Sequence, residues 1–279
     1  MKKLILGLFF GAISGANAQV NIKEIYLQSG GYFNTSNGSL ADFQQLAPNS
    51  SILNQDLSMY KNNSMYYFNL PGQAQTLSLG LGLSKLPNAT LRLGLMHTNQ
   101  NNLMQTSGSY TESFPMDTLT SSQTGEQFFI DSFSTHGYHA YYGQKQIRLD
   151  ASLIFRYNAK NRWSFFGGIG ANFGFTYQAN TNIQHYVTPW ADYNSNYSYW
   201  IYSEGTHIEE NFEHKGGYGL GVYAPLGIDF QVGKNREFWK PMHLFLELRP
   251  GFNVNQISGL ETNFSVGNFS NMGLRFAFK

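Results

Sequence analysis

Hydrophobic and polar residues alternate along much of this chain, which is the period of a β-strand whose two faces meet different surroundings. The segment TLSLGLGLSKLPNATLRLGL, residues 76–95, carries leucine at nearly every second position. Glycine, serine and Arg92 occupy the positions between the leucines. A short LPNA connection joins the two runs, so this stretch predicts a β-hairpin with one apolar and one polar face.

The same period recurs often enough to predict eight strands. They cover residues 23–33, 74–85, 90–98, 145–158, 163–178, 217–232, 242–257 and 266–279. Short turns alternate with three long connections, residues 34–73, 100–144 and 182–216. This layout predicts an all-β fold, a transmembrane antiparallel up-and-down β-barrel of eight strands with three long extracellular loops.

Two other architectures fit part of this pattern. Ten strands would result if MYYF or QFFIDSF added spans, but we expect those segments to extend hairpins beyond the membrane. A soluble β-sandwich would also alternate, but its apolar faces would pack on each other. A closed barrel pairs every backbone group internally, as lipid requires.

The N-terminus predicts export from the cytoplasm. MKKLILGLFFGAISGANA has a basic start, an apolar run and a small-residue end at Ala16-Asn17-Ala18. These are the three parts of a cleaved signal peptide. We therefore expect a signal peptide at residues 1–18, a barrel domain at residues 19–279, and a location in the outer membrane of a Gram-negative cell, in contact with outer-membrane lipid.

Composition narrows the class of partner. Charged residues make up 13% of the chain, aromatic residues 16%, and cysteine is absent. Without cysteine there is no disulfide framework and no thiolate metal site. Loss of Lys2 and Lys3 from the 18 basic residues would leave 16, against 17 acidic ones. The sequence therefore has no basic patch of the nucleic-acid-binding type, and we expect no nucleic-acid partner.

Strand parity places a set of charged side chains on the inward faces. They are Glu24, Arg92, Arg148, Asp150, Arg156, Asp229, Glu247, Arg249 and Arg275. An eight-stranded barrel is filled by its own side chains. We therefore expect a structural, ion-paired lumen that fixes strand register, rather than a path for ions.

Several of these features resemble a known family. The signal peptide, the eight spans and the terminal strand with Phe276 and Phe278 resemble small outer-membrane barrels of the OmpA/OmpX type. IRLDASLIFRYN, a short turn and FFGGIGANFGFTY are similar to a hairpin of PorT-like barrel proteins. Ala151 stands where that pattern has proline. The resemblance implies the barrel fold and carries no secretion role to this chain.

The predicted loops hold the candidate binding surface. The third loop contains seven aromatic residues, namely Tyr186, Trp190, Tyr193, Tyr197, Tyr199, Trp200 and Tyr202. Tyrosine and tryptophan are frequent in binding surfaces. These rings would either bind a ligand or form the aromatic girdle at the membrane interface, and the sequence leaves both open. Scattered apolar residues in the first loop predict an ordered cap.

Candidate chemistry is sparse. His136 and His139 form H-x-x-H near Asp131, but a metal site needs further ligands, so we expect loop histidines and no metal. His243 faces inward at the periplasmic end. No serine, histidine and acid stand at a telling spacing, so we expect no catalytic residues, no cofactor and no enzyme. An outer-membrane lipid or peptide hydrolase is the distant alternative.

Two functions follow from this pattern. The first is an integral outer-membrane barrel with a filled lumen, which acts through its extracellular loops in binding or as a structural or accessory envelope component. Its partner would be an envelope protein or an extracellular ligand. The alternative is transport, as a small-solute channel or as a subunit of a larger translocation complex.

Overall fold

The computed structural model describes residues 21–33, 36–62, 72–84, 86–157, 161–192, 205–233, 239–260 and 262–278. Three strands are unusually long: β5 (Leu86–Thr120), β6 (Gln127–Tyr157) and β7 (Trp163–Asp192). The other strands are β1 (Asn21–Phe33), β2 (Ser36–Asn37), β3 (Lys61–Asn62), β4 (Gly72–Leu83), β8 (Thr206–His214), β9 (Gly217–Tyr223), β10 (Leu226–Gln231), β11 (Met242–Ile257) and β12 (Thr262–Ala277). No helix in these ranges is long and apolar enough to span a membrane.

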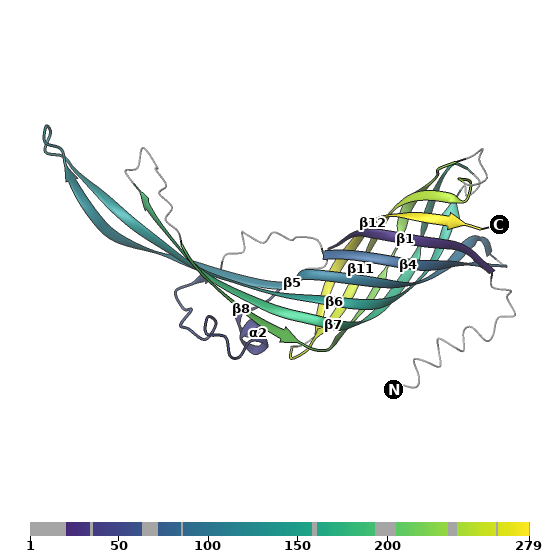
Figure 1. Cartoon of the computed structure of the whole chain (residues 1–279), viewed down its shortest axis with the longest axis horizontal. Helices are drawn as coiled ribbons and strands as arrows, with labels where there is room; N and C mark the ends of the chain where they lie inside the picture. Colours follow the sequence, from purple (N-terminus) through teal and green to yellow (C-terminus); the bar gives the residue numbers. More distant parts are fainter. Residues whose placement is uncertain are drawn as a thin grey trace.

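The main strands form a sheet that closes on itself. Pairing runs antiparallel through β10, β11, β12, β1, β4, β5, β6 and β7, and β7 pairs back onto β10. β9 continues the line of β10 and also joins β7 to β11. Ala224 and Pro225 separate β9 from β10, so these two occupy one strand position. The result is a closed ring of eight strand positions, on the right of Figure 1.

The two faces of the ring strands follow the predicted alternation. Leu77 and Leu95 are exposed, at 53% and 56% of their surface, while Ser78 and Arg92 between them are buried. β11 repeats the pattern, with Leu244, Leu246 and Leu248 exposed and Glu247 and Arg249 buried. The predicted sides of the strands are therefore confirmed, with leucines outside the ring and charges inside it.

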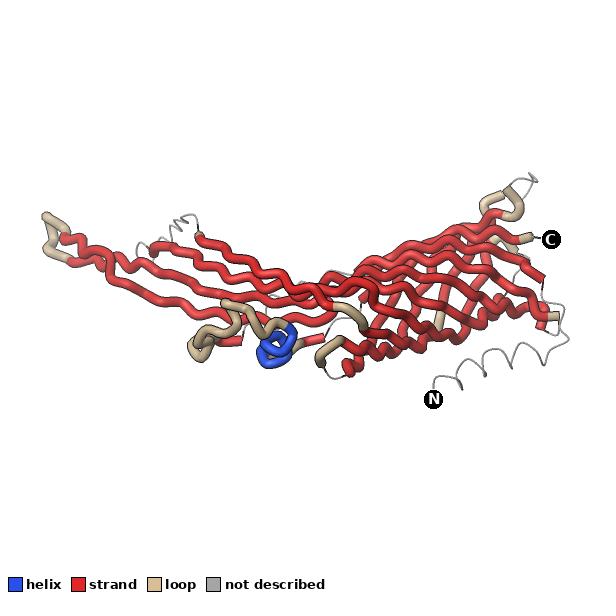
Figure 2. The backbone as a smooth tube through the Cα atoms, turned by 60° about the horizontal axis from the view of Figure 1, so that its bottom comes forward, coloured by secondary structure: helices blue, strands red, loops and turns tan. Residues whose placement is uncertain are grey.

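Half of the ring continues beyond its rim as a curved sheet, which we call the arm. The arm consists of residues 101–143 of β5 and β6 with their connecting turn, residues 179–192 of β7, and β8. It projects to the left in Figure 1, while both ends of the described chain lie at the opposite end of the ring. Figure 2 shows the ring strands passing into the arm without interruption.

The arm corrects the prediction of long loops over residues 100–144 and 182–216. The ladder between β6 and β7 runs from Tyr157↔Phe165 to Asp131↔Asp192, with one register shift. Continuous cross-strand pairing thus turns most of these segments into strand. QFFIDSF, residues 127–133, lies in β6 and does extend a hairpin beyond the ring. MYYF, residues 65–68, lies outside the described residues.

Two glycines mark the place where β8 enters the ring. Gly216 and Gly217 have φ values of 83° and 119°, a backbone conformation that residues with a Cβ rarely adopt. On one side, β8 pairs with β7 up to His214↔Ala179; on the other, β9 pairs with β7 from Tyr218↔Phe175. β8 and β9 therefore follow one edge of β7, joined by a glycine bend.

Residues 36–62 fold back as a strap across one face of the arm. The helix α2 (Leu40–Leu46) begins with a capping box, in which the Ser39 and Asp42 side chains each accept a hydrogen bond from the other's backbone N–H. Phe43, Leu46, Ile52 and Leu53 are buried against the arm. The predicted ordered cap in the first long connection is therefore confirmed.

Candidate functional site

The interior of the ring is built from layers of charged side chains, and the first layer lies at the end away from the arm. Arg275 donates to Glu24 at 2.8 Å and to Asp229 at 2.8 Å. Arg156 donates to the same Glu24 oxygen at 3.0 Å and to the second oxygen of that carboxylate at 3.2 Å. His243 completes the layer, with Nδ1 2.6 Å from Asp229. Two carboxylates are thus shared by two arginines and one histidine.

A second layer lies one step closer to the arm. Arg92 forms a two-pronged ion pair with Glu247, at 2.7 and 3.0 Å. Arg249 also donates to Glu247 and reaches Asp150 at 3.3 Å. The Tyr223 hydroxyl donates to Asp150 at 2.7 Å. These side chains are nearly fully buried, so their charges are balanced by each other and not by water.

Arg148 forms a third layer of a different kind. Its guanidinium donates to Gln146, Asn172 and Asn255, at 2.7, 2.8 and 3.1 Å. A fourth bond at 3.3 Å goes to the Tyr32 hydroxyl. Among the residues that the structure describes, Arg148 has no carboxylate partner. It is held by neutral oxygens, and it is the fifth arginine against four acids.

Two glycines of β7 make room for these layers. A Cβ at Gly174 would collide with the Arg148 side chain, and one at Gly170 would collide with the Tyr223 ring. These two glycines therefore leave space for large side chains in a crowded interior. A cavity lined by Tyr32, Tyr223 and Arg249 has a volume of about 10 Å³, about the space of a single water molecule.

The strap closes the ring at the arm end. Phe43 and Leu46 of α2 join one buried cluster with Tyr142 of β6 and Ile257 of β11. The side-chain amide of Gln45 donates to the carbonyl of Gly259 in the turn after β11, at 2.5 Å. Apolar packing from the strap therefore lies above the polar layers.

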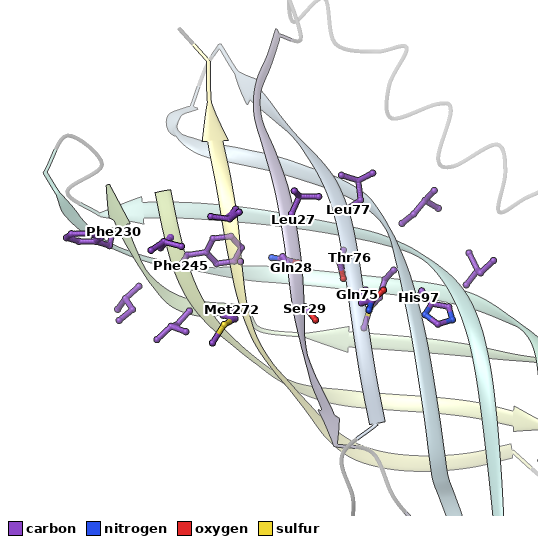
Figure 3. A pocket seen from close by; sticks show the side chains of 18 of the residues that line it. Leu27, Gln28, Ser29, Gln75, Thr76, Leu77, His97, Phe230, Phe245 and Met272 are labelled. Carbon is purple, nitrogen blue, oxygen red and sulfur yellow. The ribbon is translucent and has the colours of Figure 1, made fainter. Parts of the chain in front are cut away.

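The outside of the ring is an apolar belt. A groove is lined by residues of β1, β4, β5, β6, β7, β10, β11 and β12, among them Leu27, Leu77 and Met272 (Figure 3). Exposed aromatic rings stand at both rims. Tyr157 and Trp163 stand at the rim away from the arm, and Tyr177 and Tyr218 stand at the arm rim. The belt therefore presents hydrocarbon outward between two rows of amphipathic rings.

The structure places two of the seven aromatic residues predicted as a binding surface. Tyr186 and Trp190 lie on β7 in the arm, and the other five fall within residues 193–204, outside the described ranges. Trp190 stacks on Phe133 with ring centroids 4.1 Å apart, and its indole N–H donates to Thr135 at 3.1 Å. Tyr186 lies over Gly137 and is partly exposed.

His136 and His139 lie on strand β6, not in a loop, so that part of the prediction is wrong. Residues three apart in a strand point to opposite faces. His136 stacks on Tyr110 at 4.9 Å, on the strap side, while His139 packs against Tyr141 on the other side. Burial lowers the pKa of His139 below its ordinary value. The described residues contain no group of three or more potential ligands that could hold a metal ion.

One group on the arm was missed by sequence reasoning. Asn182 and Asn211, opposite each other on β7 and β8, both donate a side-chain hydrogen bond to the Glu209 carboxylate. These two bonds lower the pKa of the exposed Glu209, with the bond from Asn211 the larger cause. The sequence gives only an indirect signal for this group. No Lys or Arg occurs between Arg92 and Lys145 or between Arg162 and Lys215, so the acids in these segments have no basic neighbour in the sequence.

The fold and interior thus define a closed antiparallel ring with an ion-paired filling and an apolar exterior. No protein-family model matches the sequence, and no curated protein does. Among solved structures, the chain is similar to neisserial surface protein A, with a TM-score of 0.33 and 11% identity over 93% of this chain and 99% of that one. It is also similar to Ail, the attachment invasion locus protein of Yersinia pestis, solved in complex with the heparin analogue sucrose octasulfate. Here the TM-score is 0.25, with 11% identity over 92% of this chain and 100% of the other.

Proposed function

We propose that this protein is an integral outer-membrane β-barrel, exported by residues 1–18, with a filled lumen. In this proposal the ring sits in lipid, and the arm and strap stand outside the cell. The protein acts through them, as a binding or structural component of the envelope. It is not an enzyme in this proposal, and its partner is an envelope protein or an extracellular ligand.

The observation that carries the proposal is the spacing of the two aromatic rims. On β7, Trp163 and Tyr177 are both exposed, and Phe165, Ile169 and Phe175 are exposed between them. At about 3.3 Å per residue and a tilt of about 40°, the span from Trp163 to Tyr177 is about 35 Å along the ring axis. That height matches a hydrocarbon core of about 30 Å with an interfacial ring at each side.

The filled interior of the ring favours a function of the arm and strap over the passage of solutes through the ring. Three polar layers and the strap cluster lie in series between the two ends of the ring, and the layers are held by ion pairs and hydrogen bonds. Moving a solute through would require breaking several buried ion pairs, each of which leaves an uncompensated charge. This arrangement argues against the alternative of a small-solute channel.

The absence of cysteine makes a direct test possible. We would introduce single cysteines at Gln123, in the turn at the arm tip, and at Asn161, in the turn between β6 and β7. Intact cells would be treated with a membrane-impermeant maleimide. We expect labelling at residue 123 in intact cells and at residue 161 only after the outer membrane is broken.

Two results would overturn the proposal. One is labelling at residue 161 in intact cells without labelling at residue 123, which would invert the orientation. The other is recovery of the folded protein outside the membrane fraction. Planar-bilayer recordings of the purified protein complete the test, because a filled ring is expected to give no steady open-pore current.

A further inference from the structure

The charges of the arm are of one sign. The described residues of the arm, 101–143, 179–192 and 206–214, contain no Lys or Arg. They contain eight of the 17 acidic residues of the chain, which are Glu112, Asp117, Glu126, Asp131, Asp192, Glu209, Glu210 and Glu213. The described lysines next to the arm are Lys61 on the strap and Lys145 and Lys215 at the base of the arm. The arm therefore carries an unbalanced negative potential.

Cross-strand pairing gathers part of this charge on one face together with aromatic rings. Tyr141 pairs with Asn182, which pairs with Asn211 on β8; the next row ends at Glu209. Residues opposite each other in paired strands share a face of the sheet. We call this surface, opposite the strap, the aromatic face of the arm. Its described members are Phe133, Thr135, His139, Tyr141, Asn182, Gln184, Tyr186, Trp190, His207, Glu209, Asn211 and Glu213.

The aromatic face is rich in hydrogen-bond acceptors. Glu209 and Glu213 are exposed, and the hydrogen bonds to Glu209 hold its pKa low, which keeps it ionised. The neighbouring Asn182 is only 2% exposed, and its side-chain oxygen has no hydrogen-bond partner among the described residues. Buried polar atoms are nearly always paired, so this acceptor is a second, separate sign of a missing donor.

Lysine and arginine side chains are the groups that match such a surface. Both carry only donors and a full positive charge. Both also bind to the faces of tyrosine rings, and Tyr186 lies two residues along β7 from Gln184, the partner of Glu209. A polyanion would meet repulsion from the same carboxylates without any Lys or Arg to offset it.

We propose that the aromatic face of the arm binds a Lys- and Arg-rich polypeptide segment of a partner protein. The proposal rests on the proposed function, in which the arm stands outside the cell. Cationic side chains pair with Glu209 and Glu213 and lie against Tyr186, beside the buried Asn182 with its unpaired oxygen. Long-range attraction to the acidic arm speeds the encounter.

The test uses the full-length protein in detergent micelles and a fluorescent peptide of alternating arginine and serine. Binding is measured by anisotropy at low and at physiological salt. The site variant is Glu209→Gln with Glu213→Gln. The matched control is Glu112→Gln with Glu126→Gln, which removes the same charge from the strap face and from the tip turn. A third variant, Tyr186→Leu, removes an aromatic ring without changing the charge of the arm.

We expect the peptide to bind the native protein, and more weakly as salt rises. Removing two exposed ion pairs should weaken binding by about fivefold in the site variant, against less than about twofold in the control. Tyr186→Leu is expected to weaken binding at both salt concentrations, because a ring contact is less screened than an exposed charge pair.

Several results would overturn the proposal. Equal losses in the site variant and the control would mean that charge acts at a distance and not at this face. Binding of a glutamate–serine peptide or of sulfated heparin in preference to the arginine peptide would reverse the assigned ligand class. No peptide binding, with residue 123 labelled on intact cells, would refute this inference alone. Reversed labelling would instead refute the proposed function.

Discussion

The ion pair between Arg92 and Glu247 allows a quantitative test of the filled interior. Glu247 accepts two bonds from Arg92, at 2.7 and 3.0 Å, and is also bonded by Arg249. Glu247→Gln keeps the size of the side chain and removes its charge. Arg92 would then face a neutral amide with one acceptor oxygen in place of the carboxylate, beside its 2.9 Å bond to the Ser152 hydroxyl. Removing one partner of a buried pair costs about 3–5 kcal/mol, because the other charge is left uncompensated.

Urea unfolding of the protein in lipid vesicles, followed by tryptophan fluorescence, measures this loss. With an m-value of about 2 kcal/mol/M, the midpoint should fall by about 2 M. Glu213→Gln, which removes an exposed charge, serves as the control and should shift the midpoint very little. The double variant Arg92→Met with Glu247→Leu removes both charges and should recover most of the lost stability.

Two outcomes would refute this reasoning. If the free energy of unfolding of Glu247→Gln lies within about 1 kcal/mol of that of the native protein, the ion pair is not shielded from water. If the double variant is no more stable than the single one, the loss comes from packing and not from the stranded charge of Arg92.

Three further predictions concern the belt, the strap and pH. Leu149→Arg places a charge on the belt, where Leu149 is 62% exposed, and should cost about 2–4 kcal/mol near the bilayer midplane, seen as a loss of folded protein in vesicle refolding. Phe43→Ala should destabilise the strap by about 3–5 kcal/mol, seen as proteolysis within residues 36–62 while the ring stays resistant; cleavage in ring strands would contradict this. Burial lowers the pKa values of His139, His185 and His214 below the ordinary 6.5, so the neutral forms are favoured in the folded arm. Stability from these residues is complete above about pH 6.5 and is lost as pH falls toward the lowered values. Protection factors in the arm, which correct hydrogen exchange for its intrinsic dependence on pH, should be lower near pH 5.5 than near pH 7.5, and the opposite order would refute the assignment.

The ring was predictable because outward-facing and interior positions differ sharply in polarity. Leu149, Leu153 and Phe155 alternate with Arg148, Asp150 and Ser152, and one register satisfies both faces. A slip by one residue would put arginines outside, so the sequence permits one answer. The inward charges could be named for the same reason, although the pairing of particular acids with particular arginines depends on the closure of the ring.

The arm was not predictable in the same way, because the polarity contrast disappears there. Ser107, Ser109, Thr111 and Ser113 follow one another at every second position of β5, and the positions between them, Gly108, Tyr110 and Glu112, form no apolar row. Such a composition is typical of loops. These residues form strands because the ladders of the ring continue into the arm. The group at Glu209 depends on contacts with Asn182, 27 residues away, which no local pattern contains.

The continuity of β5, β6 and β7 through the rim has a consequence for reach. From residue 101 to residue 120, β5 adds 20 residues beyond the ring, or about 65 Å of strand at about 3.3 Å per residue. The headgroup zone on one side of a bilayer is only about 5–8 Å deep. With the ring in the membrane, as proposed, the arm is an extension whose base is fixed by the paired strands of the ring. Its tip can then contact molecules that lie well beyond the lipid headgroups.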